Sequence, residues 1–423
     1  MEPSDELDAD FDELFKDDDG AELDLTERIK EADAPVVKMA NLILLQAVER
    51  RAEEIHLERH AERLVVRQRV DGRLHPHMDL PVKLQNGLMA RLKILACLDI
   101  AERRRPQSGR FSMQVHGVPR EFHLFTLPGR LGESLLIRIV PPAGSLPPLD
   151  ALDFSPANLA RYQRLLASPR GLLVHAGVGD AGHDETMRCA LQALAGPERK
   201  LISIEHAVFC SVDGVIQMEA RPELPMDAAL HAALSQRPDV LLLSEIHDLA
   251  ILDLALKAAL HGCLVLAALP VREAPAALAR LLDMGAPPYL LAEALVGVCA
   301  QRRVRRLCPV CAEPHALSRE EMKLLRTDQP VRRARVAAPD TPSPCPACMG
   351  LGYRGRLSIQ EVLEVTPALR ERLRAAASTS DLAQAARAGG WEPCFEDARE
   401  KVLDGRTSLD ELLCAAPPDN STE

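Results

Sequence analysis

Apolar and polar positions follow helical and strand periods in turn over the first third of the chain. Helical spacing is found in VVKMANLILLQAVERRAEEIHL and VKLQNGLMARLKILACL, and alternation in RLVVRQRVDGRLH, RFSMQVHGVPREFHLFTLP and ESLLIRIV. These periods favour amphipathic helices and half-buried strands, respectively. Asp71-Gly72, between two alternating stretches, indicates a hairpin turn. We therefore expect a small α+β domain over residues 34–140.

The pattern changes after a proline-rich segment, residues 141–151, which we interpret as a linker. The apolar runs GLLVHA, KLISIE, DVLLLSE and CLVLAAL alternate with helical patterns such as DETMRCALQAL and AILDLALKAALHG. Such alternation predicts an α/β core, a parallel sheet with helices on both faces, over residues 152–307. Ligands of these sheets bind beyond the carboxyl ends of the strands. The loops after GLLVHA, KLISIE and DVLLLSE are therefore the candidate sites.

The first of these loops is GVGDAGHDET, which lies between an apolar run and a helical pattern. Strand, glycine loop and helix is the order of a phosphate-binding loop, and Gly177 and Gly182 fit the pattern G-x-x-x-x-G. However, His183 stands where Lys contacts phosphate, and Asp184 stands where Ser or Thr holds Mg²⁺. His183 is shorter and mostly neutral at pH 7, while Asp180, Asp184 and Glu185 repel an anionic ligand. We interpret the loop as a connection that binds neither ATP nor Mg²⁺.

Four cysteines form a second candidate site, Cys308-x-x-Cys311 and Cys345-x-x-Cys348. Two such pairs can close a tetrahedral Zn²⁺ site. A redox pair is the alternative, which we rank below zinc. With four thiolate ligands the site has no open position, so its expected role is to fold a subdomain over residues 308–352. A helical region is expected over residues 353–423.

The charge of the chain is concentrated at its beginning. The net charge is −11, and the acidic tail, residues 1–33, accounts for most of it. We expect this tail to be disordered. A second interpretation stays open, in which Phe11, Leu14 and Phe15 form one face of a short amphipathic helix that binds a basic partner. The rest is close to neutral, which argues against a general nucleic-acid binder. The sequence shows no signal peptide with a basic start and an apolar core, and no apolar run of the roughly 18 residues that span a bilayer. We therefore expect a cytoplasmic protein, whose cysteines are mostly reduced.

Several segments together resemble the ATPases of type II secretion and type IV pilus assembly. They are LLQAVERRAEEIHLE, DIAERRRPQSGRF, LISIEHAVF, RPDVLLLSEIHD, LAEALVGVCAQRRVRRLCPVC and CPACMGLGYRGRLSIQEVL, in the order of that family. The resemblance implies a PAS-like N-terminal domain, a RecA-like P-loop NTPase core, a zinc subdomain and a hexameric ring. It also implies partners at the base of a secretion or pilus machine, on the cytoplasmic face of the inner membrane.

The same resemblance shows which motor residues are kept and which are replaced. Glu205 and Glu245 occupy the catalytic carboxylate positions, and Arg110 is retained. At the other family positions this sequence carries different residues, and of these Pro270 cannot donate a proton or a hydrogen bond. The positions are His206, Phe209, Cys263, Pro270, His231, Ser235 and His123. Among these, His231, Ser235 and His123 stand where the family has basic residues. Arginines that neutralise the charge of the transition state raise the rate of phosphoryl transfer by roughly 10³- to 10⁵-fold. We therefore expect Glu205 and Glu245 to be insufficient for catalysis.

The sequence supports three hypotheses about function. The first is a degenerate paralogue that acts as a structural or regulatory subunit, in a homo-hexamer or beside an active ATPase paralogue, docked on an inner-membrane platform protein. The second is a divergent ATPase that still works, and the third is a sensor that binds nucleotide without hydrolysis. Two further interpretations stay open: a metal or pH site at His175, His183 and His206, and a binding role or a solvated helix face for the basic cluster QRRVRRL.

Overall fold

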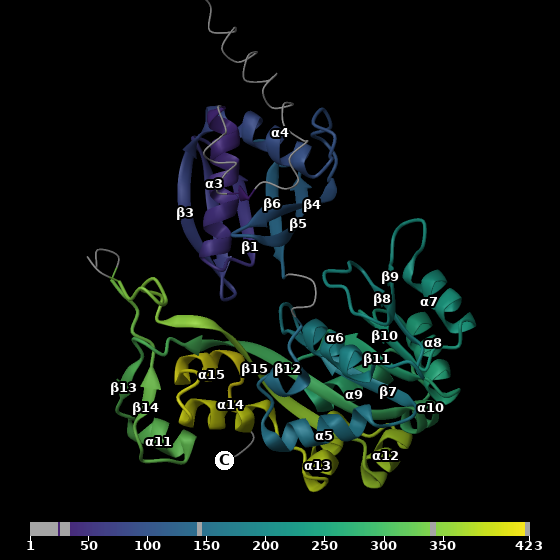
Figure 1. Cartoon of the computed structure of the whole chain (residues 1–423). Coiled ribbons are helices and arrows are strands. Elements are labelled where there is room, and N and C mark those ends of the chain that lie inside the picture. Colours follow the sequence, from purple (N-terminus) through teal and green to yellow (C-terminus); the bar gives the residue numbers. More distant parts are fainter. Residues whose placement is uncertain (1–23, 26–33, 142–145, 339–343, 419–423) are drawn as a thin grey trace, which may run out of the picture. The chain divides into compact units, whose positions relative to one another are not determined.

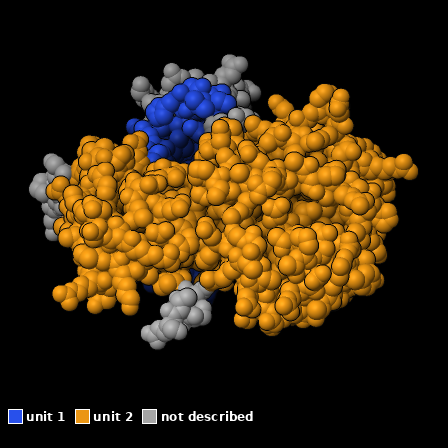
Figure 2. Space-filling view, turned by 90° about the horizontal axis from the view of Figure 1, so that it is seen from below, with its two compact units in different colours: residues 1–145 blue, residues 146–423 orange. Residues whose placement is uncertain are grey.

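The chain divides into two compact units, Met1–Ser145 and Leu146–Glu423, which Figure 2 shows in different colours. The structure, a computed structural model, describes residues 24–25, 34–141, 146–338 and 344–418. Almost all of the acidic tail, including Phe11, Leu14 and Phe15, lies outside these ranges. The division falls inside the proline-rich segment 141–151.

The first unit is an antiparallel six-stranded sheet with two helices, as the α+β prediction requires. Strand β2 buries Leu64, Val66 and Val70 on one face, which is the alternation seen in the sequence. The hairpin turn holds Asp71 at a φ of 49° and Gly72 at 79°, and two positive φ values are typical of a tight hairpin. The sheet order is β3-β2-β1-β6-β5-β4. The elements are α3 Pro35–Glu49, β1 Glu54–Arg59, β2 Arg63–Val70, β3 Arg73–Pro81, η1 Val82–Leu84, α4 Gln85–Leu95, β4 Ser108–Val115, β5 Val118–Leu127 and β6 Ser134–Val140.

A buried ion pair lies within this unit. The Lys93 ammonium on α4 lies 2.8 Å from the Glu133 carboxylate, and the two side chains are only 1% and 7% exposed. Lys93 also donates a hydrogen bond to the Glu102 carbonyl oxygen at 2.8 Å. The pair therefore joins α4 to the segment before β6 and to the loop that follows α4.

The second unit has a seven-stranded sheet in the order β15-β12-β7-β11-β10-β8-β9. All neighbouring strands are parallel except β15, which is antiparallel to β12. Strands β7, β10 and β11 are buried at every position, as expected for a sheet covered on both faces. The sheet strands are β7 Gly171–Ala176, β8 Leu201–Glu205, β9 Val215–Glu219, β10 Val240–Leu243, β11 Leu264–Leu269, β12 Leu295–Leu307 and β15 Tyr353–Glu364.

Helices cover both faces of this sheet, and each face has its own core. Leu172 and Val174 of β7 pack with α8 and α9, whereas Leu173 packs on the other side with α5 and α6. The α/β architecture is thereby confirmed. The remaining elements are η2 Leu149–Ala151, α5 Pro156–Leu166, α6 His183–Leu194, α7 Met226–Ser235, α8 Leu249–Leu260, α9 Ala274–Asp283, α10 Pro288–Ala294, β13 Glu313–His315, α11 Arg319–Leu325, β14 Val331–Arg333, α12 Pro367–Arg374, α13 Thr379–Ala388, α14 Cys394–Leu403 and α15 Leu409–Ala415.

Two long strands connect the core to the region of the four cysteines. Figure 1 shows β12 and β15 running side by side from the sheet toward β13 and β14, with α14 and α15 beside them. This arrangement corrects two expectations. The region 353–423 begins with the twelve-residue strand β15 and becomes helical only afterwards. The basic cluster QRRVRRL belongs to β12 and is not a helix face, because its residues pair with β15.

None of the helices in the described ranges combines the length and the apolar character needed to cross a membrane.

We predict that Lys93→Met destabilises the first unit by about 3–5 kcal/mol, because it leaves the Glu133 carboxylate buried without its cation. The free energy of unfolding from urea titration followed by circular dichroism measures the effect. Adding Glu133→Gln to Lys93→Met should restore most of the loss, since the buried charge is then gone.

The matched control is Arg63→Met, which breaks the exposed Arg63–Asp79 pair of the same unit. We expect it to cost about 0–1 kcal/mol. Equal losses for Lys93→Met and Arg63→Met would contradict the importance of burial.

Candidate functional site

The glycine loop joins β7 to α6 in the second unit, in the strand–loop–helix order that the sequence predicts. Gly182 immediately precedes α6 with a φ of 82°, a left-handed conformation that favours glycine. A Cβ atom on Gly182 would lie 2.4 Å from Nε of Arg303, a residue of β12. Glycine is therefore required by the backbone conformation and by a side chain that lies against the loop.

The side chain of His183, the first residue of α6, lies over the loop. A Cβ atom on Gly177 would be 2.6 Å from the His183 Nδ1 atom, and the side chain is 14% exposed. Its Nδ1 is buried without a hydrogen-bond partner in the described part of the chain. The His183 side chain is thus packed against the backbone of the glycine loop.

Two arginines neutralise acidic residues of the loop and of the first turn of α6. The Arg303 guanidinium lies 3.1 Å from the Asp180 carboxylate and also pairs with Glu185. Arg356 of β15 lies 2.6 Å from the second oxygen of Asp180. The loop is therefore held from β12 and β15 by ion pairs within the chain.

Gln301 of β12 adds neutral contacts to the same loop. Its amide nitrogen donates to the Ala181 carbonyl oxygen at 3.1 Å, and its amide oxygen accepts from the Thr186 hydroxyl at 2.8 Å. Sequence reasoning missed Gln301, Arg303 and Arg356 as loop partners. The apolar residues of QRRVRRL are three positions apart and do not alternate, so the sequence carries no periodic signal for this strand.

Glu205, at the end of β8, is occupied by structural contacts. It is 2% exposed, and one carboxylate oxygen accepts two hydrogen bonds from Arg188 of α6 at 2.8 and 2.9 Å. The other oxygen accepts from the Ser203 hydroxyl at 2.9 Å and from the Gln217 amide at 3.2 Å. These four bonds fix β8, β9 and α6 together and leave Glu205 little freedom to act on a ligand.

Glu245 lies two residues beyond β10, whose carboxyl end is adjacent to that of β8. It is half-buried, and no hydrogen bond or ion pair involves it within the described ranges. Glu245 therefore differs from Glu205 in keeping a carboxylate that other groups can approach.

Other residues assigned from the sequence do not gather at the loop. Arg110 is an exposed residue of β4 in the first unit, where it lies opposite His123. His206 is exposed, and within the described ranges the four cysteines are the one group of three or more metal-ligand side chains. The metal site at His175, His183 and His206, which the sequence left open, is therefore not formed, because their nitrogens do not come together among the described residues.

His175 is instead a core residue of β7. It is fully buried, and its Nε2 lies 2.7 Å from the Tyr162 hydroxyl of α5. Burial, with a smaller contribution from the charge of His183, lowers the pKa of His175 to about 3. The imidazole is therefore neutral throughout the physiological pH range.

The four cysteines lie together at the far end of β12 and the start of β15. Sγ of Cys308 is 3.9 Å from that of Cys345, and Sγ of Cys311 is 3.5 Å from that of Cys348. All four sulfur atoms lie within 4.8 Å of one another. Zn–S bonds of about 2.3 Å in a tetrahedron separate sulfurs by roughly 3.8 Å. The cluster is thus compatible with a structural zinc ion.

Backbone groups favour thiolate formation at one of these cysteines. The N–H of Cys348, together with that of Ala347, lowers the pKa of the Cys345 thiol to about 7. Burial raises the pKa of Cys311 and of Cys348. Cys345 therefore ionises more readily than Cys311 and Cys348, and a bound cation would favour the thiolates of those two.

The chain matches known proteins along most of its length. A family model described as type II/IV secretion system protein matches residues 29–414. The chain belongs to this family.

Two curated members of the type II/IV secretion system family illustrate the similarity. The type II secretion system ATPase E of Vibrio cholerae is 35% identical over 388 residues, which cover 90% of this chain and 76% of that protein. The type IV pilus assembly ATPase PilB of Myxococcus xanthus is 34% identical over 390 residues, covering 92% and 69%.

Solved structures share the fold at lower identity. The ATPase DotB of Legionella pneumophila aligns with a TM-score of 0.65 and 14% identity, over 89% of this chain and 95% of that one. The pilus retraction motor PilT with bound ADP aligns with a TM-score of 0.59 and 20% identity, over 89% and 96%. These structures therefore share the fold of this chain.

We predict that His175→Gln makes the stability of this family member less sensitive to acid. The unfolded chain binds a proton at His175 near its ordinary pKa, and the folded chain binds it only near pH 3. Between these values the unfolded state holds more protons, so the free energy of unfolding falls with decreasing pH by about 1.4 kcal/mol per unit. Chemical unfolding between pH 7 and pH 5 should show a steeper loss of stability for the natural chain than for His175→Gln, with the difference in slope approaching this value toward pH 5.

Glutamine keeps a hydrogen-bonding group for the Tyr162 hydroxyl but does not titrate in this range. Parallel pH dependences of the two proteins would show that His175 is protonated in the folded state.

Proposed function

We propose that this chain is a subunit of a secretion or pilus machine that keeps the architecture of the secretion ATPases without turning over ATP. The proposal rests on one observation: the Arg303 guanidinium lies against Gly182 and pairs with Asp180 and Glu185. A phosphate loop binds its ligand through backbone N–H groups and a lysine. Here the lysine is absent, and an arginine of the chain itself satisfies the loop's charge.

The surviving carboxylates support the same proposal. Glu205 is bound to Arg188 and cannot hold a metal ion without losing that buried ion pair. Asp184, which replaces the hydroxyl that holds Mg²⁺ in a phosphate loop, is about half exposed at the start of α6 and would repel a triphosphate. The site is therefore better suited to holding the strands in place than to binding a nucleotide.

A divergent but active ATPase is the second candidate. The half-buried Glu245, which has no partner in the described ranges, favours it, because a free carboxylate at this strand end could activate water. A sensor that binds nucleotide without hydrolysis is an intermediate case that the same measurements distinguish.

The partners that we propose follow from the family. The relatives are named for type II secretion and type IV pilus assembly, and this chain would join such a machine in a homo- or hetero-hexamer. An active ATPase paralogue and an inner-membrane platform protein are the proposed neighbours, at the cytoplasmic face of the inner membrane. Co-purification with such a paralogue would test the mixed assembly.

We predict that the full chain shows no Mg²⁺-dependent ATP turnover above background. Calorimetric titration with a nonhydrolysable ATP analogue should detect no binding at millimolar concentration. The double variant His183→Lys/Asp184→Thr restores the residues of a phosphate loop, and we expect it to gain measurable affinity. Turnover by the natural chain that Glu245→Gln abolishes would refute the proposal, and binding without turnover would indicate the sensor.

We further propose that the four cysteines hold one structural Zn²⁺, which would fix the ends of β12 and β15. Metal analysis of the purified chain should find about one zinc per chain. Cys308→Ser should lose the metal and lower the melting temperature, since zinc contributes directly to folding of such modules. Cys97→Ser, at an exposed cysteine of the first unit, is the matched control and should keep both. Zinc retained at full stoichiometry in Cys308→Ser would exclude this ligand set.

A further inference from the structure

The sheet of the first unit ends at strand β4, Ser108–Val115, which Figure 1 shows at the border of that sheet. Strand β4 pairs with β5 on one side, and among the strands of the described ranges none pairs with its other side. Such an edge presents a row of backbone N–H and C=O groups that can bond to a further strand.

Two residues of the N-terminal segment are held at this edge. Asp24 forms a parallel bridge with Gln114, and its carboxylate accepts a hydrogen bond from the Gly117 N–H at 2.8 Å. The next residue, Leu25, is fully buried. The segment is therefore attached to the end of β4 by its backbone, by a polar side chain and by an apolar side chain.

The bridge sets a register for the residues that precede Asp24. Gln114 lies on the outer face of β4, because its neighbours Met113 and Val115 are 3% and 2% exposed and belong to the inner face. Opposite residues of paired strands lie on the same face of a sheet. If the pairing continues, Leu23 falls on the inner face, opposite the buried Met113.

The next two residues fit the same register. Ala21 falls opposite Phe111, which is 8% exposed, and Glu22 falls opposite the exposed Ser112. The run Ala21–Asp24 thus matches β4 position by position, with apolar residues opposite buried ones and acidic residues on the outer face. A slip by one residue would place Leu23 on the solvent face and would lose this match.

Charge complementarity extends the match toward the start of β4. The exposed run Arg103–Arg105 lies shortly before β4, on the side from which a parallel strand would arrive. The acids Asp17–Asp19 precede Asp24 by about 20 Å of extended chain, at roughly 3.3 Å per residue. This is about the length of β4 from Gln114 back to its first residue, so the three acids would reach the arginines.

We propose that residues 21–24 add a seventh strand to this sheet, parallel to β4, and that Asp17–Asp19 then lie against Arg103–Arg105. The β4 edge is a docking site for an extended segment, and the chain occupies it with its own N-terminal residues. The edge is thereby closed to pairing with other chains. The proposal does not depend on the proposed function, because every residue involved belongs to the first unit.

Hydrogen–deuterium exchange of the full chain, followed by mass spectrometry, tests the added strand. About half of the N–H groups of an edge strand face outward, so they exchange fast unless a further strand covers them. We expect nearly all β4 amides of the natural chain to be protected. Leu23→Asp places a carboxylate on the inner face and should raise exchange at about half of these amides by at least tenfold.

The matched control is Leu14→Asp, the same change at a tail leucine that lies outside the register. It should leave the exchange of β4 unchanged. Peptides that cover β1 and β2 should exchange as in the natural chain in both variants, since these strands lie away from the edge. Dilution should not change the protection of β4, whereas a strand from a second copy would be lost on dilution.

Phenylglyoxal modification of the full chain tests the contact between the acids and the arginines without altering Leu23. Asp17→Asn/Asp18→Asn/Asp19→Asn should raise the rate of modification of Arg103–Arg105 by roughly threefold to tenfold at low salt, the scale of several exposed ion pairs. Asp5→Asn/Glu6→Gln/Asp8→Asn removes the same charge nearer the N-terminus and should leave that rate unchanged.

Four results would each overturn the proposal. They are fast exchange at half of the β4 amides in the natural chain, equal effects of Leu23→Asp and Leu14→Asp on β4, protection that is lost on dilution, and equal arginine modification in the two triple variants.

Discussion

The second unit depends on strand β12, which is paired along its length and carries a row of arginines that need acidic partners. Its first half lies between β7 and β15 in the core sheet, and its second half extends toward the four cysteines. Arg303 holds the glycine loop, Arg305 pairs with Glu411 of α15, and Arg306 pairs with Asp153 before α5. One strand therefore connects the core, the helices after β15 and the cysteine cluster by charge as well as by backbone pairing.

This dependence gives a physical reason for the unusual loop. Partly buried arginines need counter-charges, because removing one partner of such a pair leaves a charge without compensation. Asp180 and Glu185 provide them for Arg303 and Arg356. The same acids would repel an anionic nucleotide, so the ion pairs that hold the loop are also the contacts on which the proposed lack of ATP turnover rests. Glu205 is likewise held by an ion pair within the chain, with Arg188 of α6.

Periodicity and motif spacing were sufficient for the outline of the fold and for the cysteine site. The hairpin at Asp71-Gly72, the parallel sheet and the two CxxC pairs depend on local patterns, because turn chemistry, burial and metal-ligand spacing act over a few residues. The interpretation of QRRVRRL as a helix face was wrong, since a short basic run carries no signal for the β15 pairing that makes it a strand. The histidine site that the sequence left open is not formed, for a related reason. A shared sheet edge does not decide where side chains point, and His175 turns into the core toward Tyr162.

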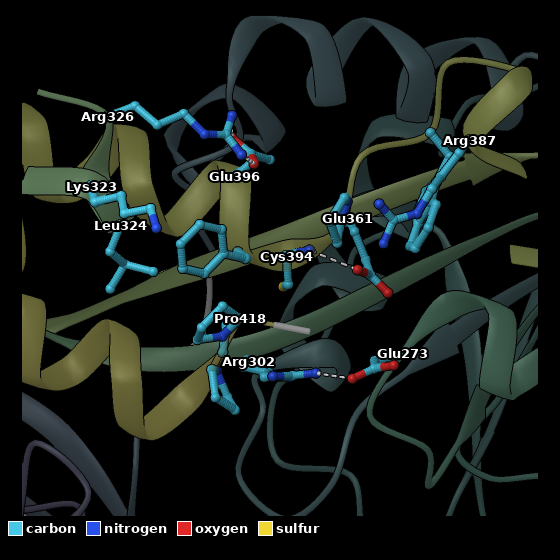
Figure 3. Close-up of a pocket in the computed structure, with 15 residues that line it drawn as sticks. Glu273, Arg302, Lys323, Leu324, Arg326, Glu361, Arg387, Cys394, Glu396 and Pro418 are labelled. Carbon is cyan, nitrogen blue, oxygen red and sulfur yellow. Dashed lines mark hydrogen bonds and ion pairs between the residues drawn. The ribbon is translucent and has the colours of Figure 1, made fainter. Parts of the chain in front are cut away.

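The sequence alone therefore determined what each segment is, because helical and strand periods and the family's motifs are written along the chain. It also led to the prediction that His183 and Asp184 stand where a phosphate loop has lysine and a hydroxyl residue. Only the tertiary structure decided what the glycine loop contacts, since Arg303 of the distant strand β12 pairs with Asp180 and Glu185. Likewise, only the tertiary structure shows that the Glu361 carboxylate accepts hydrogen bonds from the first backbone N–H groups of α9 and α14, the second of which is marked in Figure 3. Such contacts depend on how strands align in space and on which buried charges meet, and neither is encoded at any fixed distance in the sequence.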